Sequence, residues 1–313
     1  MALGSIIGLL ISMYLLIFST YWLGTLLYLI WVWTIDSDTC DRGGRRLEWF
    51  RNLAWWRYMR DYFPVQLKKQ PGVELDPKKN YLFCSFPHGM LSTGVFLSFG
   101  TNACGFQELF PSHKPYLLTL RQHFNKPYFR EIIYSLGLCS ASADSINWLL
   151  KYPGGGKAPL LVVGGVAEAF HCKPGQYILV LKNRKGFVRL AMQNGTAIVP
   201  VLAFGETDIF DQVDNPEGSY LRSFQEWFRK IAGIAPIIPV GRGFLQYSYG
   251  WVPQRRPITT IIGKPLEVQQ VENPTQEQIS AVHEKFMEHL TQFFEEEKHK
   301  YVENPEQTKL VIT

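Results

Sequence analysis

The sequence predicts an α/β fold with a largely parallel sheet, anchored by an N-terminal hydrophobic membrane helix or hairpin. Two observations support this prediction: the first 35 residues carry no charged side chain, and the rest alternates short apolar runs with helix-like stretches. The 313 residues are 46% hydrophobic and only 19% charged, against roughly 25% charged in typical soluble proteins. This composition excludes a disordered chain.

Four apolar runs have the length and composition of buried strands, at residues 81–85, 160–163, 196–202 and 258–262. Helices are predicted at residues 128–134, 145–151, 184–193 and 221–231. A final helix is well signalled, because Asn273 or Thr275 can cap it and apolar residues recur at spacings of three and four from Ile279 to Phe293. We expect its histidines, at 283, 289 and 299, to lie at the surface or on the flank of the apolar stripe, and 295–300 to form a solvated helix end.

The uncharged N-terminal segment predicts membrane contact. A continuous helix of its length would extend about 50 Å, whereas the hydrocarbon core of a bilayer is about 30 Å thick. Two geometries remain open: one tilted span, or a hairpin that turns near Ser19 and Thr20 or near Gly24. The basic residues that follow place the rest of the chain in the cytosol by the positive-inside rule, and they are Arg42, Arg45, Arg46 and Arg51.

Four regions are therefore expected along the chain. Residues 1–35 form the membrane segment, 36–75 a juxtamembrane or interfacial segment, 76–270 the cytosolic α/β domain, and 271–313 the C-terminal helix and tail. Within 47–59, aromatic residues alternate with arginines, which is typical of a helix at a lipid interface. Packing of these aromatics onto the α/β domain is an equally open interpretation.

Net charge and cysteine content limit the partners. Thirty-two basic against 27 acidic residues give +5, too small to indicate nucleic-acid binding but compatible with anionic lipid or a phosphate-bearing ligand. Five widely spaced cysteines indicate neither a disulfide framework nor a metal site. We therefore expect no metal and no tightly bound cofactor.

His88 is the histidine in the most specialised setting. It lies within 28 residues, 80–107, that contain no aspartate, glutamate, lysine or arginine, and Pro87, Gly89 and Gly94 interrupt any continuous helix there. A strand, a turn that carries His88 and an apolar helix are predicted. A histidine at such a strand end can act as a general base on an alcohol, although a buried core histidine remains the alternative.

A basic run opens the helix predicted at 184–193. Arg184, Lys185 and Arg189 flank Gly186, and cations at a helix N-terminus favour phosphate binding. A solvated basic face is the alternative interpretation of the run.

Several motifs, in order along the chain, resemble the diacylglycerol acyltransferase 2 family, which includes monoacylglycerol and wax-alcohol acyltransferases. They are Tyr62-Phe63-Pro64, Pro87-His88-Gly89, Gly164-Gly165-Val166-Ala167-Glu168, the run from Arg184 to Phe204-Gly205-Glu206, and Gly241-Arg242-Gly243. The resemblance covers almost the whole chain after the membrane segment. It implies a glycerolipid-acyltransferase-like fold and transfer of an acyl group from acyl-CoA, as co-substrate, to a diacylglycerol or monoacylglycerol hydroxyl.

The resemblance also implies a site. His88 matches the second histidine of the family's His-Pro-His-Gly motif, whereas Phe86 replaces the first. Related glycerophosphate acyltransferases carry an aspartate five residues after the catalytic histidine, where this chain has Thr93, so another carboxylate is expected to orient His88. Glu168 is the candidate and Glu206 the runner-up. The other residues expected to contact substrate are Phe86, Pro87, Gly89, Gly164, Gly165, Arg184, Lys185, Arg189 and Glu206.

Two alternatives stay open. A wax alcohol or retinol is an alternative acceptor, and a weakly active lipid-binding family member is the second alternative, supported only by Phe86. The resemblance implies the endoplasmic reticulum membrane or the lipid-droplet surface as the location, with the catalytic domain in the cytosol. A homo-oligomer is compatible with the sequence.

Overall fold

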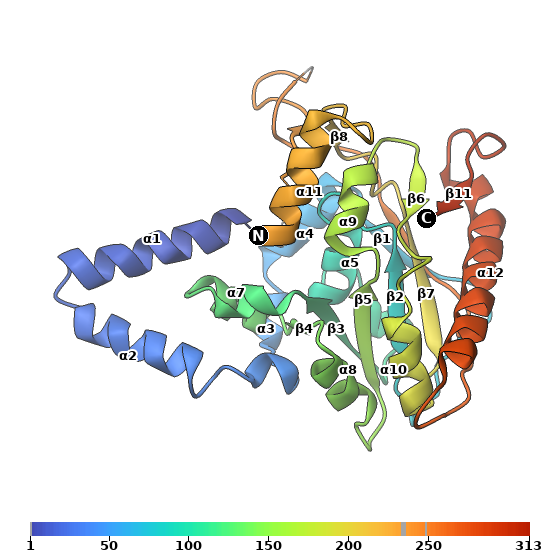
Figure 1. Cartoon of the computed structure of the whole chain (residues 1–313), viewed down its shortest axis with the longest axis horizontal. Coiled ribbons are helices and arrows are strands. Elements are labelled where there is room, and N and C mark those ends of the chain that lie inside the picture. Colours follow the sequence, from blue (N-terminus) through green and yellow to red (C-terminus); the bar gives the residue numbers. More distant parts are fainter. Residues whose placement is uncertain (1, 233–235, 248) are drawn as a thin grey trace.

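A seven-stranded sheet forms the centre of the structure, a computed structural model that describes residues 2–232, 236–247 and 249–313 (Figure 1). Its strand order is β1 (Gln66–Lys69), β10 (Thr259–Ile262), β7 (Ile198–Phe204), β2 (Leu82–Phe86), β5 (Lys157–Val162), β3 (Lys114–Thr119) and β4 (Cys139–Ser140). The strands from β7 to β4 run parallel, and β10 lies antiparallel to β7. The prediction of a mixed α/β fold with a largely parallel sheet is confirmed, and the four predicted strands are β2, β5, β7 and β10.

Helices cover both faces of the sheet. Leu82, Cys84 and Phe86 of β2 join the apolar cluster beneath α8 (Ala143–Leu150), α10 (Gly186–Asn194) and α12 (Gln276–Tyr301). Phe83 points the other way, because side chains alternate along a strand, and packs with α5 (Thr93–Val95), the π-helical turn η2 (Phe96–Gly100), α6 (Phe106–Leu109) and α7 (Phe129–Ser135). The carboxyl ends of the parallel strands therefore meet at one edge between two helical layers.

The C-terminal helix begins as predicted. Thr275 caps α12 and forms a capping box with Gln278, and its apolar stripe is buried against the sheet. The expectation for His283 is wrong, because that side chain is 1% exposed and contacts Phe187. The helix end is not simply solvated either, since the Lys298 ammonium is buried and donates to the carbonyl of Thr308.

The N-terminal segment forms two short helices, α1 (Ala2–Phe18) and α2 (Trp22–Trp33). Within the part of the chain that the structure describes, no helix has both the length and the apolar character needed to cross a membrane. The segment is thus divided into two helices and does not form the one continuous helix that a single tilted span would use. The chain breaks at residues 19–21, at one of the turns that the hairpin alternative allowed. Figure 1 shows the two helices meeting at this turn and diverging from it, away from the sheet.

Polar contacts fix the base of this hairpin to α7. The buried guanidinium of Arg130 forms an ion pair with Asp36 at 2.6 Å, and Arg45 bridges Asp36 and Glu131 at 2.7 and 2.8 Å. Arg51, predicted to mark the cytosolic flank, is instead buried, and it donates to backbone carbonyls of residues 99–101 and 136. Much of the basic cluster therefore holds the fold together.

The segment 36–75 contains η1 (Thr39–Asp41), α3 (Glu48–Arg51), α4 (Ala54–Tyr62) and β1. Both interpretations of its aromatics apply in part: Phe50 and Trp56 pack on the domain, whereas Trp49, Trp55 and Tyr58 are at least 65% exposed. Because β1 pairs with β10, the sheet already begins inside this segment.

The remaining elements are short helices and strands together with the longer helix α11. They are η3 (Arg121–Asn125), α9 (Gly165–Glu168), η4 (Ala169–His171), β6 (Tyr177–Leu179) paired with β11 (Leu310–Ile312), β8 (Asp211–Gln212) paired with β9 (Pro239–Val240), and α11 (Tyr220–Ala232). The predicted internal helices correspond to α7, α8, α10 and α11, with ends shifted by one or two residues.

Candidate active site

His88 lies in the turn that connects the carboxyl end of β2 to α5. Its ring is half-buried, and the ring atom Nδ1 lies 2.9 Å from the carbonyl oxygen of Gly89. A carbonyl only accepts hydrogen bonds, so Nδ1 carries the hydrogen and Nε2 keeps its lone pair. Burial lowers the pKa of His88, and the Gly89 carbonyl opposes that shift. The ring is therefore neutral at pH 7, with Nε2 able to accept a proton.

Glu168, at the end of α9, reaches the backbone of His88 rather than its ring. Its carboxylate accepts hydrogen bonds from the backbone N–H of His88 and from that of Val180, the latter at 2.9 Å. Burial raises the pKa of Glu168 to about 7, while the two amides and the nearby Arg184 oppose the rise. The expectation that Glu168 orients the imidazole directly is wrong in this geometry, because the Gly89 carbonyl takes that place.

Glu206 holds the other end of the same turn. This fully buried residue follows β7, and its carboxylate accepts hydrogen bonds from the backbone N–H groups of Thr93 at 2.7 Å and Gly94 at 2.8 Å. Burial raises the pKa of Glu206 to about 7, and the two amides oppose the rise. Two buried glutamates therefore hold the His88 turn at both of its ends.

Glycines make these close approaches possible. Gly89 has φ +60°, and a Cβ there would lie 2.5 Å from Cγ of Glu206. A Cβ on Gly164, between β5 and α9, would overlap the Glu168 carboxylate. Gly165 differs, because it has φ +57° and open space around its Cβ position. Gly89 and Gly164 thus serve packing of the glutamates, whereas Gly165 serves the turn into α9.

Phe86 does not line the site. Its side chain is fully buried on the α12 face, with its ring centroid 6.1 Å from that of Phe286, and Pro87 is buried as well. The prediction of Phe86 as a substrate contact is wrong, because the alternation along β2 directs it into the core. His88 lies two residues further on, beyond the end of the strand.

The basic run is divided between two surroundings. Arg184 is exposed and close enough to Glu168 to oppose the rise in the pKa of that carboxyl, so it belongs to the site edge. Lys185 instead donates from Nζ to Oγ of Ser280 on α12, at 2.8 Å. Arg189 is exposed on α10, which begins at Gly186 without a side-chain cap.

Sequence reasoning missed the backbone donors of the site. Thr93 drew attention only because it lacks the charge of an aspartate, yet its N–H group is what Glu206 binds. Gly94 and Val180 act in the same way. The spacing of Gly89 and Gly94 around the turn was the available signal, since both positions pack against Glu206.

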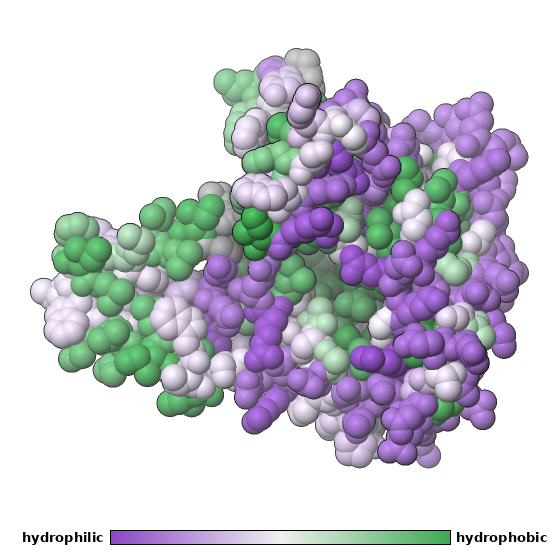
Figure 2. Space-filling view, in the orientation of Figure 1, coloured by the Kyte–Doolittle hydropathy of each residue, from purple (hydrophilic) through white to green (hydrophobic). Residues whose placement is uncertain are grey.

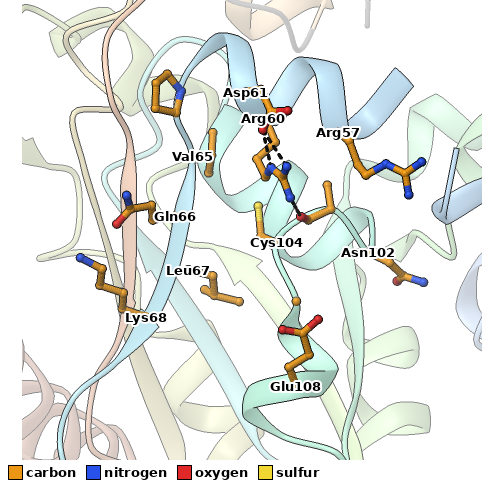
Figure 3. A pocket seen from close by; sticks show the side chains of 13 residues that line it. Arg57, Arg60, Asp61, Val65, Gln66, Leu67, Lys68, Asn102, Cys104 and Glu108 are labelled. Atoms are coloured by element: carbon orange, nitrogen blue, oxygen red, sulfur yellow. Dashed lines mark hydrogen bonds and ion pairs between the residues drawn. The ribbon is translucent and has the colours of Figure 1, made fainter. Parts of the chain in front are cut away.

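Two cavities lie near the sheet, and His88 is not among the residues that line them. One, of about 1300 Å³, borders the carboxyl end of β7 and is lined by residues that include Tyr177, Phe204 and Arg256. The other, of about 730 Å³, lies between α4, β1 and residues 102–108, where Arg60 pairs with Asp61 (Figure 3). Figure 2 shows a further hollow with apolar side chains on its floor, over α5 in the orientation of Figure 1. The His88 turn leads directly into α5.

Comparison with known proteins gives the family. The profile described as Diacylglycerol acyltransferase matches residues 14–313. The chain belongs to this family. It is 46% identical to 2-acylglycerol O-acyltransferase 1 of Bos taurus over 286 residues, covering 91% of this chain and 84% of that protein. It is 43% identical to human Diacylglycerol O-acyltransferase 2, covering 90% and 72% of the two chains, and 41% identical to human Acyl-CoA wax alcohol acyltransferase 2, covering 93% and 86%.

The resemblance inferred from the motifs is thus confirmed for the diacylglycerol acyltransferase family. Among solved structures, the 1-acyl-sn-glycerophosphate acyltransferase of Thermotoga maritima matches with a TM-score of 0.40 and 9% identity, covering 84% of this chain and 94% of that chain. Relatives within the family are named for acylglycerol and for wax-alcohol acceptors, with similar identities to this chain. Family membership therefore does not distinguish between these acceptors.

Proposed function

We propose that the protein transfers an acyl group from acyl-CoA to the hydroxyl of a monoacylglycerol or diacylglycerol. The observation that carries this proposal is the His88 turn, where the Gly89 carbonyl fixes the ring tautomer and leaves Nε2 as a neutral base. Family membership supports acyl transfer, and the similarity to acylglycerol acyltransferases supports the acceptor.

In the proposed reaction, Nε2 of His88 removes the proton from the acceptor hydroxyl as its oxygen attacks the thioester carbonyl. The tetrahedral intermediate then collapses, the carbon–sulfur bond breaks, and the CoA sulfur receives the proton from the imidazolium. Glu168 and Glu206 act as positioning residues, because they bind the backbone at both ends of the turn that presents the ring. The step needs acyl-CoA as its only co-substrate.

We assign binding of the tetrahedral oxyanion to backbone N–H groups and binding of the CoA phosphates to the basic run. N–H groups around Gly89 and Gly165 are the proposed donors to the tetrahedral oxyanion. Arg184 and the uncapped start of α10 are proposed to bind CoA phosphates, because cations and helix N-termini both favour phosphate. Arg189, exposed one turn into α10, extends this basic surface.

The hairpin of α1 and α2 is proposed to insert into one leaflet of a membrane. Its helices extend only about 26 Å and about 18 Å, less than the roughly 30 Å of a hydrocarbon core. Large apolar side chains are nevertheless exposed along both helices, as Figure 2 shows. The endoplasmic reticulum membrane, with the α/β domain in the cytosol, or the lipid-droplet surface is the proposed location.

A competition experiment tests the proposed function. Microsomes that carry the full chain receive labelled acyl-CoA together with monoacylglycerol, diacylglycerol and a long-chain alcohol, and the labelled products are separated. We expect labelled acylglycerols to predominate and to fall to background with His88→Ala at equal protein level. Predominant wax ester would overturn the acceptor assignment. Undiminished turnover by His88→Ala would eliminate His88 as the base, and binding of acyl-CoA without any product would favour a lipid-binding protein.

A further inference from the structure

We propose that α11 and the loop residues 241–247 and 249–252 form a second membrane-contact surface that binds anionic lipid headgroups. This aromatic surface consists of Tyr220, Phe224, Trp227 and Ile231 on α11 and of Phe244, Leu245, Tyr247, Tyr249 and Trp251 in the loop. The proposal concerns a region outside the hairpin and the active site, and it does not depend on acyl transfer.

The orientation of α11 is the first observation. A helix on a protein in water normally buries its apolar stripe and exposes its polar face. Here Arg222 and Gln225 are buried at 7% and 1% exposure, whereas the apolar residues four and three apart, from Tyr220 to Ile231, are 53–97% exposed. The helix thus binds the protein through its polar face and presents its aromatic face outward, as an interfacial helix does.

Specific hydrogen bonds hold α11 in this orientation. The Arg222 guanidinium stacks over the ring of Phe170 at 4.7 Å and donates to the backbone carbonyl of the same residue at 3.5 Å. Gln225 accepts a hydrogen bond from Asn215 at 2.9 Å and donates to the carbonyl of Pro236 at 3.2 Å. The outward aromatic face is therefore built into the fold, and Arg222 connects it to η4, which directly follows Glu168.

The loop beside α11 also presents aromatic and apolar side chains to the outside. Backbone bridges between Gly241 and Gly250 and between Arg242 and Val252 close it at its base. Beyond that base, the five apolar and aromatic loop residues of the surface are 57–100% exposed. Figure 1 shows the loop next to α11 on one side of the molecule, and apolar side chains reach the surface there in Figure 2. An exposed patch of this kind marks an interaction site.

Charge favours an anionic bilayer as the occupant. Residues 219–257 contain six basic residues and one acidic residue, a net +5, which equals the net charge of the whole chain. Lys230 and Arg255 are exposed beside the aromatic residues. Tryptophan and tyrosine favour the headgroup level of a bilayer, and basic residues next to them bind anionic lipids. A second copy of the chain would instead bring two surfaces of equal positive charge together.

Site-specific fluorescence on the full-length protein tests this surface. An environment-sensitive label is placed at Phe224→Cys or Leu245→Cys in a Cys104→Ser background, because the other four cysteines are buried. The protein is reconstituted into vesicles of phosphatidylcholine with phosphatidylserine. Glu288→Cys, exposed on α12, is the matched control. At both surface positions we expect several-fold less quenching by aqueous iodide and strong quenching by doxyl-labelled lipid, neither of which Glu288→Cys shows.

Three results would overturn the proposal. Iodide quenching at positions 224 and 245 equal to that at 288 would mean that the surface stays in water. Protection from iodide without quenching by doxyl lipid, together with a crosslinked dimer, would mean that a second copy covers it. Equal lipid quenching in phosphatidylcholine alone, unchanged by Lys230→Glu, would remove the anionic headgroup from the proposal. Because transferase activity is not the readout, failure of the proposed function would leave this test intact.

Discussion

The Glu168 carboxylate binds the backbone N–H of His88 while the imidazole of His88 hydrogen-bonds the carbonyl of Gly89. The ring is thus oriented by a neutral acceptor, and no ion-pair partner lies at it among the residues that the structure describes. A carboxylate next to the ring would stabilise the imidazolium and raise the pKa of the histidine. Without one, burial dominates and lowers the pKa of His88, which has a direct consequence for the pH dependence of the reaction.

Acyl transfer should persist to a lower pH than the ordinary pKa of a histidine would allow. Only neutral His88 can accept a proton, so activity is present above its pKa and is lost as the pH falls through that value. Because the pKa of His88 lies below its usual 6.5, we expect the acid limb of kcat/KM for acyl-CoA to have its midpoint below pH 6.5. Initial rates measured from about pH 5 to about pH 8 check this. A midpoint above 6.5 would contradict His88 as the titrating group, and Glu168 and Glu206, whose pKa values burial raises to about 7, would then account for the acid limb.

Glu168→Gln should reduce turnover less than His88→Ala does. Glutamine keeps the shape, but its NH₂ group faces one of the two backbone donors that the carboxylate accepts from, at His88 or Val180. An unsatisfied buried donor costs about 1–3 kcal/mol, so we expect kcat to fall by roughly ten- to a hundredfold. Loss of a general base costs about 10²- to 10⁴-fold.

The comparison requires purified enzyme in detergent micelles, with Glu288→Gln as the surface control. Glu288 is exposed on α12 and should show the rate of the unmodified protein. A Glu168→Gln enzyme with an unchanged rate would mean that the Glu168 hydrogen bonds do not hold the productive position of the turn.

The sequence predicts features that depend on local periodicity. The β2 strand, the turn with His88 and the capped start of α12 at Thr275 all follow from patterns within about ten residues. The hydrogen bonds of Glu168 could not be predicted, because its partner is a backbone amide 80 residues away, and sequence does not report which amide a side chain will meet.

The sequence also does not predict which face of an amphipathic helix packs against the protein. The spacing from Tyr220 to Ile231 defines an aromatic stripe on α11, but the stripe points outward because Arg222 and Gln225 find buried partners. His283 shows the reverse case, since a polar residue expected at the surface lies against Phe187. Tertiary contacts, not propensity, decide these orientations.

Gly89→Ala should impair the site more than a matched glycine substitution elsewhere. Both Gly89 and Gly72 have positive φ, at +60° and +77°, so alanine strains either backbone by about 1–2 kcal/mol. Only at Gly89 would the new methyl group lie 2.5 Å from Cγ of Glu206, whereas nothing lies within 4 Å at Gly72. We expect similar losses of unfolding free energy from strain, with an added loss and at least tenfold lower turnover for Gly89→Ala. Equal turnover in the two variants would contradict the packing of Gly89 on Glu206.

Arg184→Gln should weaken acyl-CoA binding while leaving the chemical step nearly intact. Arg184 is exposed at the start of α10, close to Glu168, where a phosphate would meet both its guanidinium and free backbone donors. We expect KM for acyl-CoA to rise several-fold, kcat to change little, and the salt dependence of kcat/KM to become shallower. Lys78→Gln, exposed before the amino end of β2, is the control and should leave KM unchanged. Equal KM values in the two variants would remove Arg184 from the proposed phosphate contacts.

Phe86→His should destabilise the protein without increasing turnover. Phe86 supplied the only support for a weakly active family member, yet its ring is fully buried beside Phe286 and does not line the site. An imidazole at this position would place polar nitrogens in an apolar cluster, which costs about 1–3 kcal/mol when they lack partners. Phe86→Leu keeps the position apolar and should cost about 1 kcal/mol. Thermal unfolding and acyl transfer measured on both variants check this, and a rise in turnover with Phe86→His alone would place residue 86 in the reaction.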